Sequence, residues 1–311
     1  DLNENHFITA LADDAVTRVI VGYLESITSG DAFIKAAEMA AAKKPIVIFK
    51  AGVTQAGVKA ASSHTGSLAG ADIAYGAAFK RSGVIRADTF EAMFDFSTAF
   101  AMQPLPKGNR VAIITNAGGP GIMAADAVEL AGMQIGRLTD QLGKELAAKL
   151  PAAASVNNPI DVLGDADPER YVMALNTAQD DETIDAIIVI LTPQAMTQAA
   201  ATARAIAKAS RGEKPILVSF MGGEDVQPGR EILVASGLPD YPAPERAVAS
   251  LRAMVDYASW LRRPPRVVTR FRVNRRRAER IIHRHLRTGQ FQVGEAQAKN
   301  ILRAYEFNVS P

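Results

Sequence analysis

The sequence has 311 residues, of which 48% are hydrophobic and 22% charged, with a formal net charge of +2 and no cysteine. This length and composition favour a globular protein with two compact units, and the near-neutral charge argues against a protein built as a whole to hold nucleic acid. The absence of cysteine excludes disulfides and thiolate chemistry. The lack of a long apolar run and of a signal-peptide pattern leads us to expect a cytoplasmic protein without a membrane partner.

Strands and amphipathic helices alternate in a first series that ends near residue 107. Short apolar runs predict strands at Thr17–Leu24, Pro45–Lys50 and Val84–Arg86. The predicted helices of this series are Gly30–Lys43, Gly70–Ser82 and Thr89–Met102. The segment QPLPKGN at 103–109 carries two prolines and a glycine, which indicates a domain boundary.

A second series begins with the predicted strand Arg110–Thr115, followed by the turn NAGGPG and a helix. The apolar residues that we expect to share one face of this helix are Met123, Ala127, Leu130 and Ala131. The later elements are predicted strands at Ile184–Leu191 and Pro215–Phe220 and helices at Met196–Ser210 and Ala243–Leu261. Alternation of this kind predicts parallel sheets with helical crossovers.

The basic residues are concentrated after the second series. The segment Arg262–Arg287 holds eleven arginines and one acid, so it carries +10 while the rest of the chain carries −8. A nucleic-acid patch is one interpretation, and we favour a solvated basic linker and helix face. His283 and His285 diverge on a helix, so we expect no metal site there. A final helix is predicted at Val293–Tyr305.

The turn NAGGPG is the first candidate site. A glycine-rich turn between a strand and a helix presents free N–H groups to an anion, and the helix dipole favours negative charge there. The candidate phosphate-binding residues of this turn are Asn116, Gly118, Gly119 and Gly121. The alternative is a tight turn in which glycines only relieve steric strain, and the turn by itself does not separate the two.

The loop SSHTGSLAG, after the predicted strand Pro45–Lys50, is the second candidate. It holds His64, whose neutral imidazole is a nucleophile near pH 7 and can accept a phosphoryl group. The neighbours that could hold such a group by hydroxyl or backbone donors are Ser63, Thr65, Gly66 and Ser67. The alternative is an ordinary loop histidine.

A phosphorylated histidine needs an acceptor on its other ring nitrogen to fix the tautomer. Glu25 ends the predicted strand Thr17–Leu24 and would emerge at the same sheet edge as the His64 loop. The alternative for Glu25 is a solvated carboxylate at a strand end, and the sequence leaves both open.

The ordered motifs together resemble those of the NDP-forming acyl-CoA synthetases, a branch of the succinyl-CoA synthetase superfamily. They are YLE, KAGVTQAG, SSHTGSLAG, GNRVAIITNAGGPG and NNPIDVLGDAD, followed by a helix containing Pro244, Glu245 and Arg246. The resemblance implies that His64 is the phosphorylated histidine, that Glu25 orients it, and that NAGGPG starts one of two helices facing it. Asn158, Pro159 and Asp161 match a further family element, to which we assign a structural turn role.

The resemblance implies an α/β protein of two consecutive flavodoxin-like, succinyl-CoA synthetase-like open parallel sheets, with helices on both faces and a basic helical C-terminal tail. We expect a phosphohistidine domain at 1–107 that lacks its first strand, a ligase-CoA domain at 108–266, and a linker with the start of an ATP-grasp domain at 267–311. The CoA-binding domain and most of the ATP-grasp domain are then expected elsewhere in the polypeptide or in a partner subunit, and we expect an oligomer.

The implied reaction converts acyl-CoA, ADP and phosphate into a carboxylic acid, CoA and ATP, through an acyl phosphate and phospho-His64. Complete enzymes use CoA, ADP or ATP, and Mg²⁺, whereas we expect this chain alone to be inactive and to hold tightly only phosphate or another anion. The alternative function is a non-catalytic acyl-CoA sensor attached to a protein lysine acetyltransferase. The presence of His64, Glu25 and the glycine turn favours the synthetase.

Overall fold

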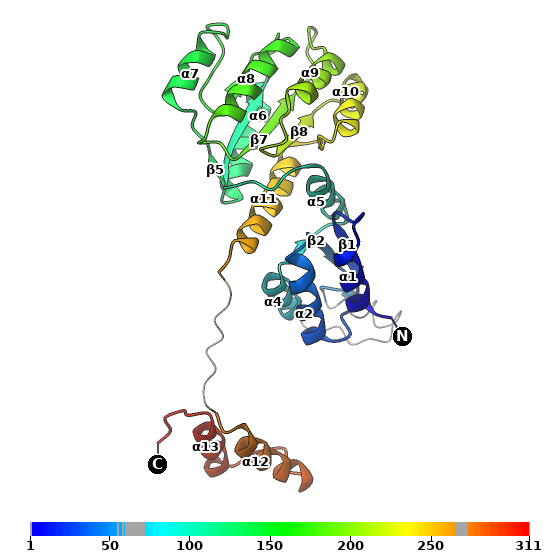
Figure 1. Ribbon diagram of the computed structural model, residues 1–311, viewed down its shortest axis with the longest axis vertical. Coiled ribbons are helices and arrows are strands. Elements are labelled where there is room, and N and C mark those ends of the chain that lie inside the picture. Colours follow the sequence, from blue (N-terminus) through cyan, green and yellow to red (C-terminus); the bar gives the residue numbers. More distant parts are fainter. Residues whose placement is uncertain (1, 55, 58, 60–71, 265–272, 311) are drawn as a thin grey trace. The chain divides into compact units, whose positions relative to one another are not determined.

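The computed structural model of the protein describes residues 2–54, 56–57, 59, 72–264 and 273–310. The chain divides into two compact units, Asp1–Arg263 and Pro264–Pro311. The first unit contains two parallel sheets with their helices, and the second contains two helices (Figure 1). No helix in the described part of the chain is both long and apolar enough to cross a bilayer.

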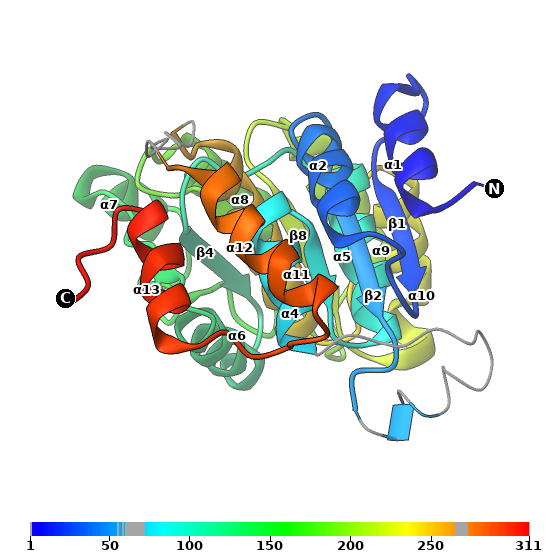
Figure 2. The ribbon, with the colours of Figure 1, turned by 90° about the horizontal axis from the view of Figure 1, so that it is seen from below.

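The first sheet has three parallel strands in the order β1-β2-β3. Its elements are α1 (Glu4–Asp13), β1 (Ile20–Leu24), α2 (Gly30–Ala41), β2 (Ile46–Lys50), α4 (Asp72–Ser82), β3 (Ile85–Ala87) and α5 (Phe90–Met102). Ile46 and Ile48 of β2 pack with α1, α2 and α4, whereas Val47 between them packs with α5 on the other face. Figure 2 shows the ribbon of β2 with the neighbouring helices α2 and α5. Both faces of β2 are therefore covered by helices, which is why this strand is almost entirely apolar.

The second sheet has five parallel strands, and its path runs β5-β4-β7-β8 with β6 also paired to β4. Its elements are β4 (Arg110–Thr115), α6 (Gly118–Leu130), β5 (Gln134–Ile135), α7 (Asp140–Ala147), β6 (Ile160–Asp161), α8 (Pro168–Asp180), β7 (Ala186–Leu191), α9 (Ala199–Ala209), β8 (Ile216–Phe220), α10 (Gly223–Ala235) and α11 (Pro244–Leu261). Because β4 lies between β5 and β7, the sheet changes its direction of winding at β4. Open parallel sheets bind ligands at the carboxyl ends of strands at such a point.

Helix α11 joins the two sheets into one unit. Leu251 and Met254 are fully buried in a core that includes residues of both sheets and of α5 and α6. The hydroxyl of Tyr257 donates to the carbonyl of Ala41 at the end of α2 (2.7 Å). Arg246 forms a two-bond ion pair with Asp95 of α5, at 2.6 and 2.8 Å. The helix therefore combines apolar burial with polar contacts to the first series.

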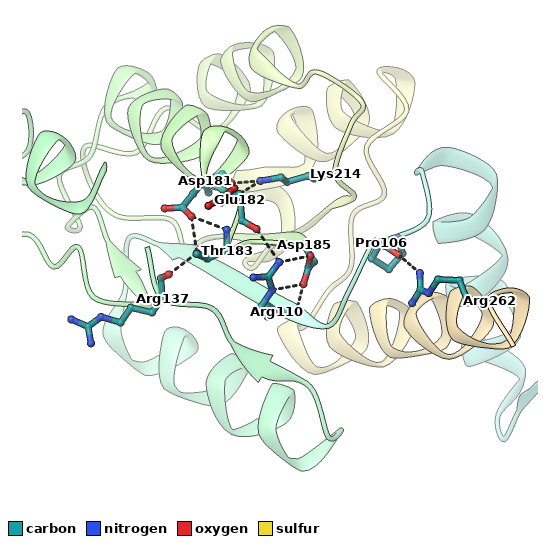
Figure 3. Close-up of polar contacts among 10 residues, drawn as sticks. Pro106, Arg110, Arg137, Asp181, Glu182, Thr183, Asp185, Lys214 and Arg262 are labelled. Atoms are coloured by element: carbon teal, nitrogen blue, oxygen red, sulfur yellow. Dashed lines mark hydrogen bonds and ion pairs between the residues drawn. The ribbon is translucent and has the colours of Figure 1, made fainter. Parts of the chain in front are cut away.

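A dense polar network closes the edge of the second sheet where β4 and β7 begin (Figure 3). Asp185 is 7% exposed and accepts three hydrogen bonds from Arg110, from its backbone N–H (3.0 Å), Nε (2.8 Å) and Nη2 (2.9 Å). Asp181 is fully buried and accepts from the N–H and hydroxyl groups of Thr139 and Thr183. Burial acts to raise the pKa of both carboxyls, but these hydrogen bonds outweigh it and hold each pKa below 3.8.

The second unit contains α12 (Arg275–Arg287) and α13 (Glu295–Ala304), which pack against each other. Asn274 caps α12 by accepting from the N–H of Arg277 (3.1 Å). The buried residues of the two helices are Ala278 in α12 and Ala304 in α13. Arginine side chains occupy much of the exposed surface of α12. The basic tail is thus helical, as predicted.

The predicted α/β class with two parallel sheets is confirmed, and each strand predicted in the two series is present. β1 begins three residues later than predicted, because the carboxylate of Asp14 holds Thr17 in a turn by accepting from its N–H (2.8 Å). Elements without a strong sequence signal were not predicted, namely α1, α7, α8, α10, β5 and β6.

The apolar face predicted for the helix after NAGGPG is not the face that α6 buries. Leu130 is 89% exposed and Met123 is 42% exposed. The buried face of α6 consists of Gly121, Ala124 and Val128. Small residues on this face let the helix lie close to β4, so backbone proximity and not side-chain size determines which residues are buried.

The first testable prediction concerns the network at the start of β4. Substituting Asp185→Asn should lower the free energy of unfolding by about 2 kcal/mol at pH 7, less than for a fully buried pair because the Arg110 side chain is 40% exposed. Because the folded-state pKa of Asp185 lies below 3.8, the stabilisation is present above that pH and is lost as the pH falls through the folded-state value. Urea unfolding at pH 7 and near pH 3 measures both effects.

Asp140→Asn is the matched control, because Asp140 and Arg137 are 83% and 90% exposed and 3.7 Å apart. We expect it to change stability by less than about 0.5 kcal/mol. Equal losses for Asp185→Asn and Asp140→Asn would contradict the prediction.

Candidate functional site

The first part of the candidate site is the turn between β4 and α6. Asn116, directly after β4, is 4% exposed. Its Oδ1 accepts from the N–H of Thr192 (2.8 Å) and its Nδ2 donates to the carbonyl of Thr192 (2.9 Å). Asn116 therefore ties the carboxyl ends of β4 and β7 together at the switch point. Its side chain is occupied in doing so, which leaves the main chain beyond it to contact a ligand.

The start of α6 offers free backbone donors. The N–H groups of Gly118 and Gly119 have no acceptor among the described residues, as expected for the first turn of a helix. A Cβ atom placed on either glycine would meet no atom within 4 Å, so the space in front of them is open. The first turn carries no acid, so its partial positive charge is not neutralised locally. This arrangement fits a phosphate or another anion.

A second glycine turn on this sheet, before α10, does have acidic residues in the first turn of its helix. Helix α10 begins at Gly223, and its first turn contains Glu224 and Asp225. These carboxylates offset the positive end of the helix dipole and repel anions. Of the two glycine turns, the one at α6 is the candidate anion site.

Gly121 has a packing role in the structure. It is buried, and its N–H donates to the carbonyl of Ala117 (3.2 Å). A Cβ atom at this position would lie 3.0 Å from Cγ2 of Thr115 and 3.5 Å from Cβ of Pro159. The absence of a side chain therefore lets α6 start close to β4, which aims the preceding N–H groups outward.

The NNPID motif fills the gap between β5 and β6 alongside β4. Oδ1 of Asn158 accepts from the N–H of Ile113 (2.9 Å), and its Nδ2 donates to the carbonyls of Val111 and Gly136 (both 2.7 Å). Oδ1 of Asp161 accepts from the N–H of Leu163 (2.9 Å), whose φ angle is 73°. These contacts show a structural role for the motif.

The second part of the candidate site is Glu25, directly after β1. The Oε2 atom of Glu25 is buried and has no hydrogen-bond partner among the described residues. A buried carboxylate oxygen without a donor is costly, and such groups call for an explanation. Glu25 is therefore better described as an acceptor in need of a donor than as a solvated carboxylate at a strand end.

Lys50 is a residue of this site that the sequence analysis missed. It ends β2, is 3% exposed, and its Nζ donates to the carbonyl of Glu25 (2.8 Å) and to that of Ala51. Burial lowers the pKa of its ammonium group, and the carboxylates of Asp72 and Glu25 act in the opposite direction. The available signal was a lysine at the end of an otherwise apolar strand.

The predicted loop residues of the candidate site are not among the residues that the structure describes. Ser63, His64, Thr65, Gly66 and Ser67 lie outside the described residues. Glu25 and Lys50, on the neighbouring strand ends, are described. The expected contact between His64 and Glu25 therefore stays a prediction.

Two of the other histidines form local contacts with the backbone of their own helices. Nδ1 of His6 accepts from the N–H of Asn3 (3.2 Å) as part of a helix cap, and Nδ1 of His285 lies 3.0 Å from the carbonyl of Ile281. Within the described ranges, no group of three or more histidine, aspartate or glutamate side chains is placed to hold a metal ion.

Comparison with known families assigns both sheets. Residues 1–100 match the succinyl-CoA ligase like flavodoxin domain, and residues 111–265 match the Ligase-CoA domain. The two matches correspond to the first and second sheet with their helices.

Curated relatives match over nearly the whole chain. An ADP-forming acetate–CoA ligase I of Archaeoglobus fulgidus is 39% identical over 312 residues, which cover 100% of this chain and 44% of the relative. An ADP-forming 4-hydroxybutyrate–CoA ligase of Nitrosopumilus maritimus is 34% identical, with coverage of 98% and 44%. The alpha subunit of an ADP-forming acetate–CoA ligase II of Pyrococcus furiosus is 40% identical, with coverage of 83% and 57%. The chain thus spans less than half the length of the first two relatives.

A solved structure agrees with these matches. The dinucleotide-forming acetyl-coenzyme A synthetase 1 of Ca. Korarchaeum cryptofilum, in complex with phosphate and ADP, superposes with a TM-score of 0.81 at 33% identity. The match covers 86% of this chain and 60% of that one. The fold, the family domains and the relatives agree, and the chain belongs to the NDP-forming acyl-CoA synthetases of the succinyl-CoA synthetase superfamily.

Proposed function

We propose that this chain is the phosphohistidine-bearing core of an NDP-forming acyl-CoA synthetase. The observation that carries the proposal is the start of α6, where Gly118 and Gly119 present two free N–H groups to open space at the switch point of a parallel sheet. Such a site binds and stabilises a phosphoryl group without covalent chemistry. The Oε2 atom of Glu25 is buried and has no hydrogen-bond partner among the described residues, so it can accept from an imidazole N–H. This supports the proposed role of Glu25 in orienting His64.

The proposed reaction has three balanced transfers. Phosphate attacks the thioester carbon of acyl-CoA, and CoA leaves as an acyl phosphate forms. A ring nitrogen of His64 attacks the phosphorus of the acyl phosphate, and the carboxylate leaves. The terminal oxygen of ADP then takes the phosphoryl group from His64, which yields ATP and regenerates the imidazole.

The chain contributes positioning and charge stabilisation to these transfers. In the proposal, the N–H groups of Gly118 and Gly119 contact the phosphoryl oxygens, and Asn116 holds the turn. Glu25 accepts from the imidazole N–H of His64 and so fixes the nitrogen that is free to attack. The remaining proposed donors lie on the loop itself: Ser63, Thr65, Gly66 and Ser67.

The proposal assigns CoA, ADP and Mg²⁺ to parts beyond the two sheets. The described residues fit a phosphoryl group at α6, but they offer no cluster of carboxylates that would hold Mg²⁺. When bound elsewhere in the complete enzyme, Mg²⁺ would neutralise nucleotide phosphate charge.

We propose domain limits at 1–107, 108–266 and 267–311, with the last segment leading into an ATP-grasp domain. The alpha subunit of the Pyrococcus furiosus relative is itself only part of a divided enzyme, which supports a CoA-binding domain and an ATP-grasp domain in the same polypeptide or a partner subunit. We further propose an oligomer that acts in the cytoplasm, where CoA and ADP are available. None of the relatives described above favours the acetyltransferase alternative.

The direct test is phosphorylation of the full-length protein with γ-labelled ATP and Mg²⁺. We expect acid-labile, base-stable label on the wild type and none on His64→Asn, because the amide side chain keeps the polarity but cannot accept a phosphoryl group. Equal labelling of the two proteins would overturn the proposed function. We expect the isolated 311-residue chain to remain unlabelled, because it does not present the nucleotide.

A second prediction separates catalysis from stability at the glycine turn. Gly119→Met should slow phosphorylation of His64 by about 100-fold, because the added side chain would occupy the space in front of the N–H groups and keep the phosphoryl oxygens away from them. The loss of one preorganised donor contact costs about 3 kcal/mol of transition-state stabilisation. Its unfolding temperature should be unchanged, because a Cβ atom at Gly119 meets nothing within 4 Å.

Gly143→Met is the matched control for this variant. Gly143 also lies in a helix with no atom within 4 Å of a Cβ position, but it belongs to α7. We expect wild-type phosphorylation for Gly143→Met. A full rate for Gly119→Met would remove the turn from the mechanism, and a large loss of stability would show that the effect is structural.

A further inference from the structure

Lys50 is a buried charged group at the candidate site for which the proposed mechanism has no use. Only 3% of it is exposed, at the end of a strand whose other residues are apolar. Taking an ammonium group out of water costs several kcal/mol unless it is fully compensated. An apolar residue would complete β2 without that cost, so the presence of a buried positive charge at this position has to be explained.

All contacts of the ammonium group lie at the carboxyl edge of the first sheet. Nζ donates to the carbonyl of Glu25 (2.8 Å) and to that of Ala51, and it lies 4.4 Å from the ring centroid of Tyr75. The carbonyl acceptors belong to the ends of β1 and β2, and the ring belongs to the first turn of α4. Two carbonyls and a ring face satisfy the ammonium group in a fixed geometry.

The nearby carboxylates differ in what they already bind. Asp72, the first residue of α4, is held by Nη2 of Arg86 on β3 at 2.9 and 3.2 Å. Glu25 Oε2 has no hydrogen-bond partner within the described ranges. The positive charge of Lys50 therefore acts on one carboxylate that is already paired and on one that is not.

We propose that Lys50 is a positioning residue that holds Glu25, through its main-chain carbonyl and its charge, in the conformation in which the carboxylate orients His64. The inference rests on the proposed function and adds a residue to it. Lys50 does not touch the phosphoryl group in this scheme. It acts by fixing the end of β1, from which the Glu25 side chain projects, and by keeping a positive charge beside that carboxylate.

A double-mutant cycle in the full-length protein tests this role. The variants are Lys50→Met, Glu25→Gln and the combination of both, and the measured quantity is the rate of His64 labelling from ATP. We expect Lys50→Met to be about 10- to 100-fold slower than wild type, the range found when a group that orients a histidine is lost. We expect the double variant to match Glu25→Gln within about 2-fold, because Lys50 acts through Glu25.

A merely structural lysine gives a different result. The two losses would then multiply in the double variant, and this outcome overturns the inference, as does a wild-type rate for Lys50→Met. If Lys50→Met does not fold, as judged by thermal unfolding, Lys50→Gln keeps an N–H donor and replaces it in the same cycle with the same two outcomes. Lys43→Met is the control, because Lys43 is 54% exposed in a surface pair with Asp13 and should label at the wild-type rate.

The assay also separates failure of this inference from failure of the function. Absence of label on wild-type His64 overturns the proposed function and, with it, the role of Lys50. Label on wild-type His64 together with multiplicative losses overturns only the role of Lys50.

Discussion

The burial of α11 between the two sheets is the constraint on which the rest of the first unit depends. Leu251 and Met254 are fully buried in a core that includes residues of both sheets, and each fully buried side chain of this size contributes about 1.5 to 3 kcal/mol. Apolar packing alone has no preferred direction. The hydrogen bond from Tyr257 to Ala41 and the ion pair between Arg246 and Asp95 fix the helix along its length. Because both sheets are bound to the same helix, the strand ends that carry the candidate site belong to one compact body.

The two edges of the second sheet use their polar groups in opposite ways. Where β4 begins, the carboxylates of Asp181 and Asp185 are buried and saturated with hydrogen bonds, which stabilises the fold. Where β4 ends, the amides of Gly118 and Gly119 stay without acceptors in the described structure. Free N–H groups occur at the start of any helix, so it is the lack of acids in the first turn and the open space around the two glycines in the described structure that fit an anion. The same contrast separates the saturated Asp72 from the unpartnered oxygen of Glu25 in the first sheet.

Strong local patterns were sufficient to predict the longer strands and many of the helices, although α8 and α10 were missed. The apolar run Arg110–Thr115 is a strand with the predicted limits, since a strand buried on both faces leaves an unbroken apolar signature. Two-residue strands such as β5 carry no such pattern, because their pairing depends on β4. The apolar face of α6 that the sequence predicted includes the exposed Leu130 and is not the buried one, since the distance of the helix from β4 depends on Gly121 and Pro159. A large apolar residue is buried only when there is enough space for its side chain between the helix and the sheet.

The sequence by itself determined the fold class and the family motifs, because these follow from apolar periodicity and from glycine, histidine and hydroxyl residues in a fixed order. It also predicted the candidate site residues, with Glu25 at the same sheet edge as the His64 loop, because parallel strands end at one edge. Only the tertiary structure showed that the side chain of Asn116 is hydrogen-bonded to the backbone of Thr192 and that Lys50 is buried against the carbonyl of Glu25. It also showed open space around Gly118 and Gly119 in the described part of the chain. These facts depend on contacts between residues distant in the sequence, and no local pattern encodes which polar group finds a partner and which is left without one.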